Sequence, residues 1–104
     1  MNDMKMLTVV CGERIEDEVL LVFTDLNIKG YTVISGVGGS GQTGTVSGTG
    51  SWLDRNKLYL IALDNAHVAP FIDAIKALHT SLVQEHHGRE VPLKVFVHPC
   101  ELIV

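Results

Sequence analysis

Four runs of apolar and β-branched residues alternate with two longer segments of helical periodicity along the chain. The helical segments carry apolar residues at spacings of three and four, which predicts one apolar face on each. The first covers Glu13–Leu26, and the second follows a cap at Asp64–Asn65 and continues to about Val83. The apolar runs predict strands at Lys5–Cys11, Tyr31–Ser35, Lys57–Leu63 and Lys94–His98.

Prolines and the chain end refine these predictions. Pro70 lies within the second helical segment, so we expect it in the first turn, where its missing N–H is not needed. Pro99 cannot donate to a central ladder and predicts a bend or an edge position for the last strand. Residues Glu101–Val104 either extend that strand or add a short edge.

The element order is therefore β-α-β-β-α-β. That order predicts an α+β fold of the ferredoxin-like type, a four-stranded antiparallel sheet with two helices on one face. The length of 104 residues suits a single domain, spanning residues 1–104. The uncovered face of such a sheet needs a cover, and another subunit is the simplest candidate.

Composition narrows the class of protein. Hydrophobic residues make up 46% of the chain and charged residues 19%, which favours self-association. The net charge is −4 and no Lys/Arg cluster occurs, so nucleic-acid binding is disfavoured. No apolar run has membrane-spanning length and no signal-peptide pattern begins the chain, so we expect a cytoplasmic protein. The two cysteines, Cys11 and Cys100, are then free thiols.

A glycine-rich segment follows the second predicted strand. It reads Gly-Val-Gly-Gly-Ser-Gly-Gln-Thr-Gly over residues 36–44, and we expect little regular structure in it. The letters G-x-G-x-x-G occur, but no helix begins within them and no Gly-Lys-Ser/Thr follows, which excludes a dinucleotide fingerprint and a P-loop. Two interpretations stay open, an anion-binding nest of backbone amides and a simple hairpin loop.

Candidate chemistry elsewhere is sparse. The acidic cluster at residues 16–18 is interpreted as a solvated helix start. His79 and His86 share one helix face and His87 is adjacent, but these spacings do not specify a metal site. Neither cysteine has the partners of a nucleophile, and no general acid–base set is present, so no catalytic residue is assigned.

Three short segments carry a family resemblance. They are Ile-Lys-Gly-Tyr-Thr-Val at residues 28–33, Gly-Gly-Ser-Gly-Gln at 38–42, and Lys-Val-Phe-Val at 94–97. Together with the element order and the long loop at about residues 36–56, they resemble the PII signal-transduction family, in which that loop is called the T-loop. The resemblance implies a homotrimer with adenine nucleotides bound in clefts between subunits. It also implies that the loop reports the ligand state to a target, such as a transporter or an enzyme.

The resemblance assigns roles by position. Thr32 would face the adenine, and Gly38, Gly41 and Gln42 would lie near phosphates or a small effector. Two further groups would come from the loop that precedes the last strand and from the strand itself. They are Gly88 with Arg89, and Lys94.

The sequence also departs from that family. The loop is short and lacks the tyrosine that classical members modify, and Pro99–Val104 lacks the arginine pair that grips phosphates. The chain therefore resembles a divergent, non-enzymatic PII-like sensor, with bicarbonate as one candidate small anion. The alternative is a CutA-like metal-binding trimer of the same fold, using His79, His86, His87 or a cysteine. A small ferredoxin-like enzyme ranks last.

Overall fold

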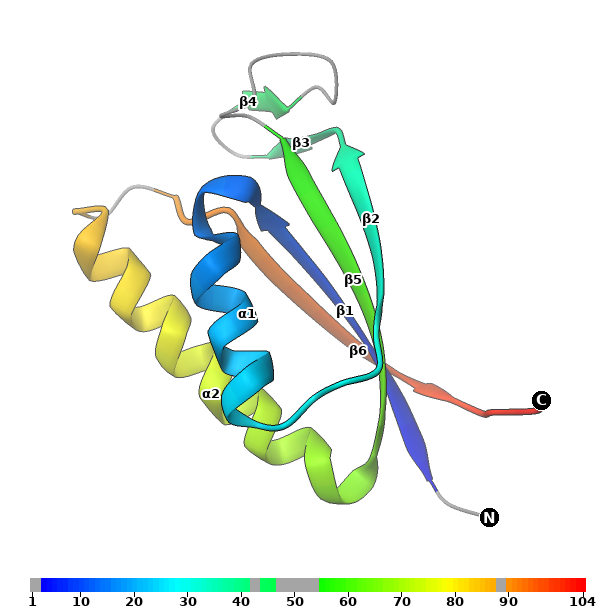
Figure 1. The fold of residues 1–104 in the computed structure, drawn as a ribbon. Helices are drawn as coiled ribbons and strands as arrows, with labels where there is room; N and C mark the ends of the chain where they lie inside the picture. The colour runs from blue at the N-terminus through cyan, green and yellow to red at the C-terminus, as the bar shows by residue number, and fades with distance from the viewer. Residues whose placement is uncertain (1–2, 42–43, 47–54, 88–89) are drawn as a thin grey trace.

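A computed structural model describes residues 3–41, 44–46, 55–87 and 90–104 of the chain (Figure 1). Strands and helices alternate in the predicted order, with one addition, a short hairpin inside the glycine-rich segment. The elements are β1 (Met4–Gly12), a 3-10 turn η1 (Glu13–Ile15), α1 (Glu16–Asp25), β2 (Thr32–Val37), β3 (Gly39–Gly41), β4 (Gly44–Val46), β5 (Asn56–Asp64), α2 (Asn65–Glu85) and β6 (Leu93–Cys100).

The main sheet has four strands in the order β2-β5-β1-β6, and every neighbouring pair is antiparallel. Both helices lie on the same face of this sheet (Figure 1). The predicted ferredoxin-like fold is therefore confirmed. None of the helices in the described part of the chain is long and apolar enough to cross a membrane.

Alternation along the strands places the core between the sheet and the helices. Successive side chains of a strand point to opposite faces, so every second residue of β1 and β5 faces the helices. Leu7, Val9, Tyr59 and Ile61 are accordingly buried, and Phe71 of α2 packs with them. The ring of Phe23 on α1 meets the Tyr59 ring edge-on at 5.3 Å between centroids, which joins the two layers.

The glycine-rich segment corrects one expectation. Residues 39–41 and 44–46 pair as an antiparallel hairpin, β3–β4, where the composition predicted little regular structure. Extended backbone is open to glycine, and Thr45 and Val46 favour it. Pairing gives these backbone groups partners that a glycine-rich loop would otherwise leave to water.

The start of α2 corrects the expected positions of the helix cap contact and of Pro70. Asp64 is the N-cap residue as predicted, but its side chain makes no capping bond and instead contacts Nδ1 of His67 at 2.5 Å. Because the helix begins at Asn65, Pro70 is in its second turn and not in the first. Proline there cannot donate to the carbonyl of Ala66, a loss that the burial of Phe71 and Ile75 in the core offsets.

The last strand bears out one prediction and contradicts another. Pro99 pairs in register with Lys5 on β6, which is an outer strand of the sheet, so the predicted edge position is confirmed. The expected strand at residues 101–104 is wrong, because these residues leave the sheet and are exposed. Among the described residues, β6 pairs with β1 alone, and that pairing ends at Met4 with Cys100.

Replacing Pro70 by alanine tests the strain in α2. Alanine restores the donor to the Ala66 carbonyl, and proline inside a helix costs about 3 kcal/mol relative to alanine. Pro70→Ala should therefore stabilise the fold by about 1–3 kcal/mol and raise the melting temperature by several degrees. Asp73→Ala, at an exposed position one turn later, is the control and should change it little. A lower melting temperature for Pro70→Ala would contradict this account.

Candidate functional site

Four chain segments meet at one end of the main sheet. Val37 pairs with Asn56, and Asn56 pairs with Gly12, so β2, β5 and β1 end in one row. The Gly12 amide donates to the Pro92 carbonyl at 2.9 Å, which extends the row to the start of β6. We call this row, Val37–Asn56–Gly12–Pro92, the loop end of the sheet. The β3–β4 hairpin and the C-terminal end of α2 lie at the same end (Figure 1).

The turn after β1 joins the glycine-rich segment to the start of β6. The Gly12 amide binds Pro92, and the next amide, that of Glu13, donates to the Arg55 carbonyl at 2.9 Å. Gly12 is required by space, since a Cβ at this position would lie 2.9 Å from Cγ of Pro92. The segment that returns from the hairpin and the segment that enters β6 are thus held by consecutive amides.

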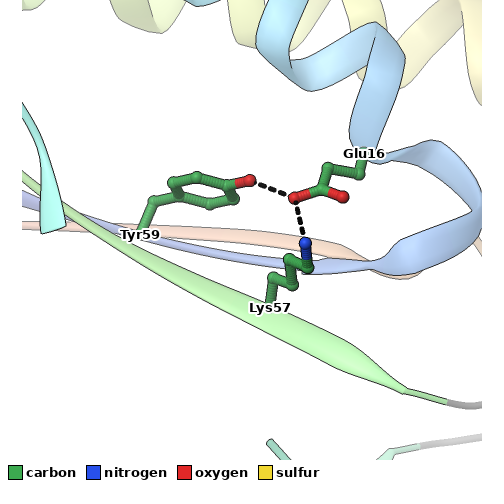
Figure 2. A network of polar contacts seen from close by, with 3 residues as sticks. All are labelled: Glu16, Lys57 and Tyr59. Atoms are coloured by element: carbon green, nitrogen blue, oxygen red, sulfur yellow. Dashed lines mark hydrogen bonds and ion pairs between the residues drawn. The ribbon is translucent and has the colours of Figure 1, made fainter. Parts of the chain in front are cut away.

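A charged network joins the start of α1 to β5 near the loop end of the sheet (Figure 2). Lys57 Nζ lies 3.0 Å from Oε2 of Glu16, and the Tyr59 hydroxyl donates to the same oxygen. Lys57 and Tyr59 are two residues apart on β5 and therefore point to the same face. Glu16, the first residue of α1, thereby ties that helix to the strand leaving the glycine-rich segment.

This network corrects the interpretation of the acidic cluster. Glu16 was expected to be solvated, but its side chain is only 17% exposed and holds two partners. Asp17, by contrast, is exposed as expected. The spacing of Lys57 and Tyr59 along one strand was the available signal, but only the packing of α1 on β5 identifies their common acceptor.

This environment raises the pKa values of three side chains, those of Cys11, Lys57 and Tyr59. Burial, with the nearby Glu16 carboxylate, raises the pKa of the Cys11 thiol from 9.0 to about 12. Burial and the bond to Glu16 likewise raise the pKa of Tyr59, whereas the bond to Glu16 raises the pKa of Lys57. Near neutral pH Cys11 is thus a protonated, buried thiol, in agreement with the inert cysteine expected from the sequence.

The predicted ligand residues divide between the two outer strands. Thr32 is the first residue of β2, and Gly38 and Gly41 lie beyond its end, whereas Lys94 lies on β6. The order β2-β5-β1-β6 separates the outer strands by three interstrand spacings, or about 14 Å. Gln42, Gly88 and Arg89 are outside the described residues. A single chain therefore does not bring Thr32 and Lys94 together.

Thr32 and Lys94, the predicted ligand residues on the two outer strands, lie on the same face of the sheet. Thr32 pairs with Leu60, which pairs with Thr8, and Lys94 pairs with Val10, two residues nearer the loop end on β1. All of these alternate with the buried residues, so they belong to the face away from the helices. Thr32 and Lys94 are both exposed there.

The histidines do not assemble a metal centre in the described part of the chain. No group of three or more His, Cys, Asp or Glu side chains that could hold a metal ion occurs among those residues. His86 uses Nδ1 on the Leu82 carbonyl at 2.7 Å, in the last turn of α2. That contact caps the C-terminal end of the helix, so Nδ1 of His86 is already occupied.

Removing the charge of Glu16 should weaken the contact between α1 and β5. In Glu16→Gln the side chain keeps its size, but Lys57 loses its counter-ion. Because both groups are partly exposed, we expect a loss of only about 1 kcal/mol in the free energy of unfolding, measured by urea denaturation. The Glu13 amide should also exchange its hydrogen faster. Asp17→Asn, one residue along and exposed, is the control, and equal effects of the two variants would refute the role of Glu16.

Alkaline pH should destabilise the fold through Cys11. The unfolded chain releases the thiol proton near pH 9.0, whereas the folded chain keeps it to about pH 12. Stability is thus complete below pH 9 and falls above it, by about 1.4 kcal/mol per pH unit for this one group. Cys11→Ala should show a shallower decline in urea titrations between pH 8 and 11 under reducing conditions. Val9→Ala, another buried truncation on β1, should keep the steeper decline, and equal slopes in both would contradict the assignment.

Solved structures share this fold at low sequence identity. CPII from Thiomonas intermedia K12, described as a nitrogen regulatory PII-like protein bound to ADP, AMP and bicarbonate, is 18% identical, with a TM-score of 0.76 over 96% of this chain and 88% of that one. A DUF3240 family protein from Shewanella baltica OS155 is 16% identical, with a TM-score of 0.66 over 100% and 97%. PII from Arabidopsis thaliana, bound to citrate, is 18% identical, with a TM-score of 0.63 over 95% and 78%.

Sequence comparison identifies the family directly. No curated protein matched the sequence significantly. A family model described as nitrogen regulatory protein P-II matches residues 4–104. Its members are non-enzymatic signalling regulators, as expected for this chain, and the match does not favour the CutA-like alternative. Since the match extends over almost the full length, the chain belongs to the nitrogen regulatory protein P-II family.

Proposed function

We propose that this chain is a cytoplasmic, homotrimeric signalling protein. It binds an adenine nucleotide, together with a small anion such as bicarbonate, in clefts between subunits. Through the loop at about residues 36–56 it regulates a partner protein, a transporter or an enzyme. The observation that carries this proposal is that Thr32 and Lys94, two of the expected ligand residues, lie on the two opposite outer strands of one sheet.

That placement favours a site built by two chains. Thr32 and Gly38 lie on the β2 side of the molecule, and Lys94 lies on the β6 side. A ligand cleft normally surrounds most of its ligand. With two intervening strands between the groups, a cleft using both sets requires the β2 edge of one copy beside the β6 edge of the next. The single domain over residues 1–104 then contributes to two clefts, one at each edge.

The available positive charge suits a phosphate or carboxylate. Lys57 is already neutralised by Glu16, so it is a poor candidate for a ligand contact. Lys94 is exposed on its strand. Nε of Arg55 is a buried side-chain nitrogen without a hydrogen-bond partner in the described part of the chain, and it lies at the exit of the glycine-rich segment. A chain of net charge −4 that binds an anion needs such local cations, and these two are positioned near the loop end.

The related structures indicate which ligands to test. CPII from Thiomonas intermedia K12 was solved with ADP, AMP and bicarbonate, and PII from Arabidopsis thaliana with citrate. Nucleotide phosphates, bicarbonate and citrate are all anions with several oxygen acceptors. The side chains of Arg55 and Lys94 are cationic donors of the matching kind.

The anchoring of the loop supports its role as a reporter. Its two ends are fixed, one by Val37 in the sheet and the other by the Arg55 carbonyl and the Glu16 network. A ligand at the loop end can therefore bias the conformation of the intervening segment without disturbing the core. Such ligand-dependent ordering of a loop is a common switching device, and the loop surface is what a partner protein would contact.

A thermal-shift panel tests ligand class. ATP, ADP, AMP, cyclic AMP, bicarbonate and zinc are added singly and in pairs. A ligand that binds only the folded state and is present at ~100 times its dissociation constant adds about 2.7 kcal/mol, which corresponds to several degrees for a domain of this size. We expect a shift with at least one adenine nucleotide, enlarged by bicarbonate. A shift with zinc alone would overturn the proposal in favour of a metal-binding trimer.

Substitutions then test the site. Lys94→Ala removes a charge-assisted hydrogen bond to an anionic ligand, so its affinity for the nucleotide found in the panel should fall roughly 10- to 100-fold by calorimetry. Gln42→Ala should also weaken binding. Lys29→Ala removes an exposed lysine from the connection before β2 and should leave affinity unchanged. Unchanged affinity in both Lys94→Ala and Gln42→Ala would refute the site assignment.

A further inference from the structure

Four side chains with sulfur or nitrogen donors lie together on β1 and β6. Met4 pairs with Cys100 and Met6 pairs with His98, in a register that runs without a shift along both strands. β1 begins and β6 ends in this region, at the end of the sheet away from the β3–β4 hairpin (Figure 1). We call these four residues the Met–His–Cys cluster.

All four side chains belong to the face of the sheet away from the helices. On β1 the two methionines alternate with Leu7 and Val9, which are buried under the helices. On β6 the buried Leu93 faces the helices, so His98 and Cys100 point to the opposite face. His98 is exposed and the other three side chains are partly exposed, so an ion from solvent can reach the cluster.

Cross-strand geometry brings the four groups within reach of one ion. Directly opposed residues have Cβ atoms about 5 Å apart, and residues two positions apart on a strand are separated by about 7 Å. An ion above this rectangle lies nearest Cys100, because cysteine has the shortest of the four side chains. The imidazole of His98 and the two flexible, unbranched methionine side chains can extend to the same point.

Packing does not account for this cluster. Methionine normally fills irregular gaps in hydrophobic cores, but neither Met4 nor Met6 belongs to the buried core or to the apolar residues packed against it. Among the described residues, His98 and Cys100 hold no hydrogen bond or ion pair, and Cys100 is a free thiol. Cys11 is buried on the other face of the sheet and cannot form a disulfide with Cys100 within the chain.

The neighbouring strand adds no further donor to the cluster. On β5, Ala62 pairs with Met6 and Asp64 pairs with Met4. Alanine has no donor atom in its side chain. The Asp64 carboxylate contacts Nδ1 of His67 at 2.5 Å, so it is engaged with the first turn of α2. The donor set is therefore two thioethers, one imidazole and one thiol.

This donor set favours a soft metal ion. Zinc is bound in proteins by Cys, His and carboxylate groups, and only two of the four side chains are of these types. An iron–sulfur cluster requires more thiolates than the single one present in the cluster. Thiolate and thioether ligands together select Cu(I). Binding displaces the thiol proton of Cys100 to solvent and leaves a Cu(I)–thiolate pair with no net charge.

From this arrangement we propose that the Met–His–Cys cluster is a Cu(I)-binding site, with one ion per chain. Cys100 is the anionic ligand and His98 the nitrogen ligand, and the thioethers of Met4 and Met6 complete the coordination. The site shares no residue with the predicted nucleotide site, so it does not rest on the proposed function. It also uses none of the three histidines considered for the CutA-like alternative.

Competition with a chromophoric Cu(I) chelator tests the site. The full chain, reduced and kept free of oxygen, is titrated into the Cu(I) complex of bicinchoninic acid, and the loss of chelator absorbance reports the transferred copper. We expect the chain to withdraw one Cu(I) per chain, and an excess of Zn²⁺ should not return the copper to the chelator. A chain that withdraws no Cu(I), or that loses it to Zn²⁺, would overturn the proposal.

Substitutions with matched controls locate the bound ion. Cys100→Ala should lower the Cu(I) affinity by about 100-fold or more, and His98→Gln and Met6→Leu by roughly 10- to 100-fold. Cys11→Ala removes the thiol on the other face, and His79→Gln replaces an exposed imidazole on α2, so both should keep the wild-type affinity. Equal affinities in Cys100→Ala and Cys11→Ala would overturn the proposal.

Methionine methyl NMR provides a second readout that does not depend on the cysteine variant. Ag⁺ is a soft ion with the same closed shell as Cu(I), and it is added to the chain labelled at the methionine methyl carbons. The signals of Met4 and Met6, assigned with Met4→Leu and Met6→Leu, should shift until one ion is bound per chain. If Cys100→Ala does not fold by circular dichroism, this measurement decides, and unshifted signals at saturating Ag⁺ would overturn the proposal.

Discussion

The rest of the structure depends on the pairing of β1 with two strands at once. β5 lies on one side of β1 and β6 on the other, both antiparallel over nearly the full length of the strand. This central ladder places the two helices on one face, because the β1–α1–β2 and β5–α2–β6 crossovers start on antiparallel strands, run in opposite directions across the sheet and are both right-handed. It also fixes which strands are left at the edges. β2 and β6 are outer strands of opposite direction as a direct result of the position of β1.

The same ladder brings the functional segments together. At its end, consecutive amides of Gly12 and Glu13 hold Pro92 and Arg55, and Glu16 then binds Lys57 and Tyr59 from the start of α1. These contacts thus connect the end of the glycine-rich segment to the start of β6. The core beneath them, with Phe23 against Tyr59, is closely packed and supports both ends of that segment.

Local pattern was sufficient for most of the fold. The alternation around Leu7, Val9 and Ile61 and the helical spacing around Phe71 and Ile75 identify all four main strands and both helices, because burial on one face imposes those periods. Pro99 correctly indicated an edge strand, because a missing N–H is tolerated only there. The depth of Pro70 in α2 could not be obtained in this way, since the core contacts of Phe71 and Ile75 offset a local cost that a single-residue rule treats as decisive.

The sequence by itself determined the helices and strands and their order, because these follow from local periodicity. Its glycine content and matched motifs also indicated which residue types lie at the loop end. Only the tertiary structure decided which groups meet. The sequence does not distinguish Glu16 from a solvated acidic residue, because Glu16 meets its partners only when α1 packs on β5. The pKa of the Cys11 thiol is raised only because the folded chain buries it beside that carboxylate. Thr32 and Lys94 are on opposite edges because strand order is a long-range property. Pairing between distant strands is set by the packing of the entire sheet, which no local segment of the sequence encodes.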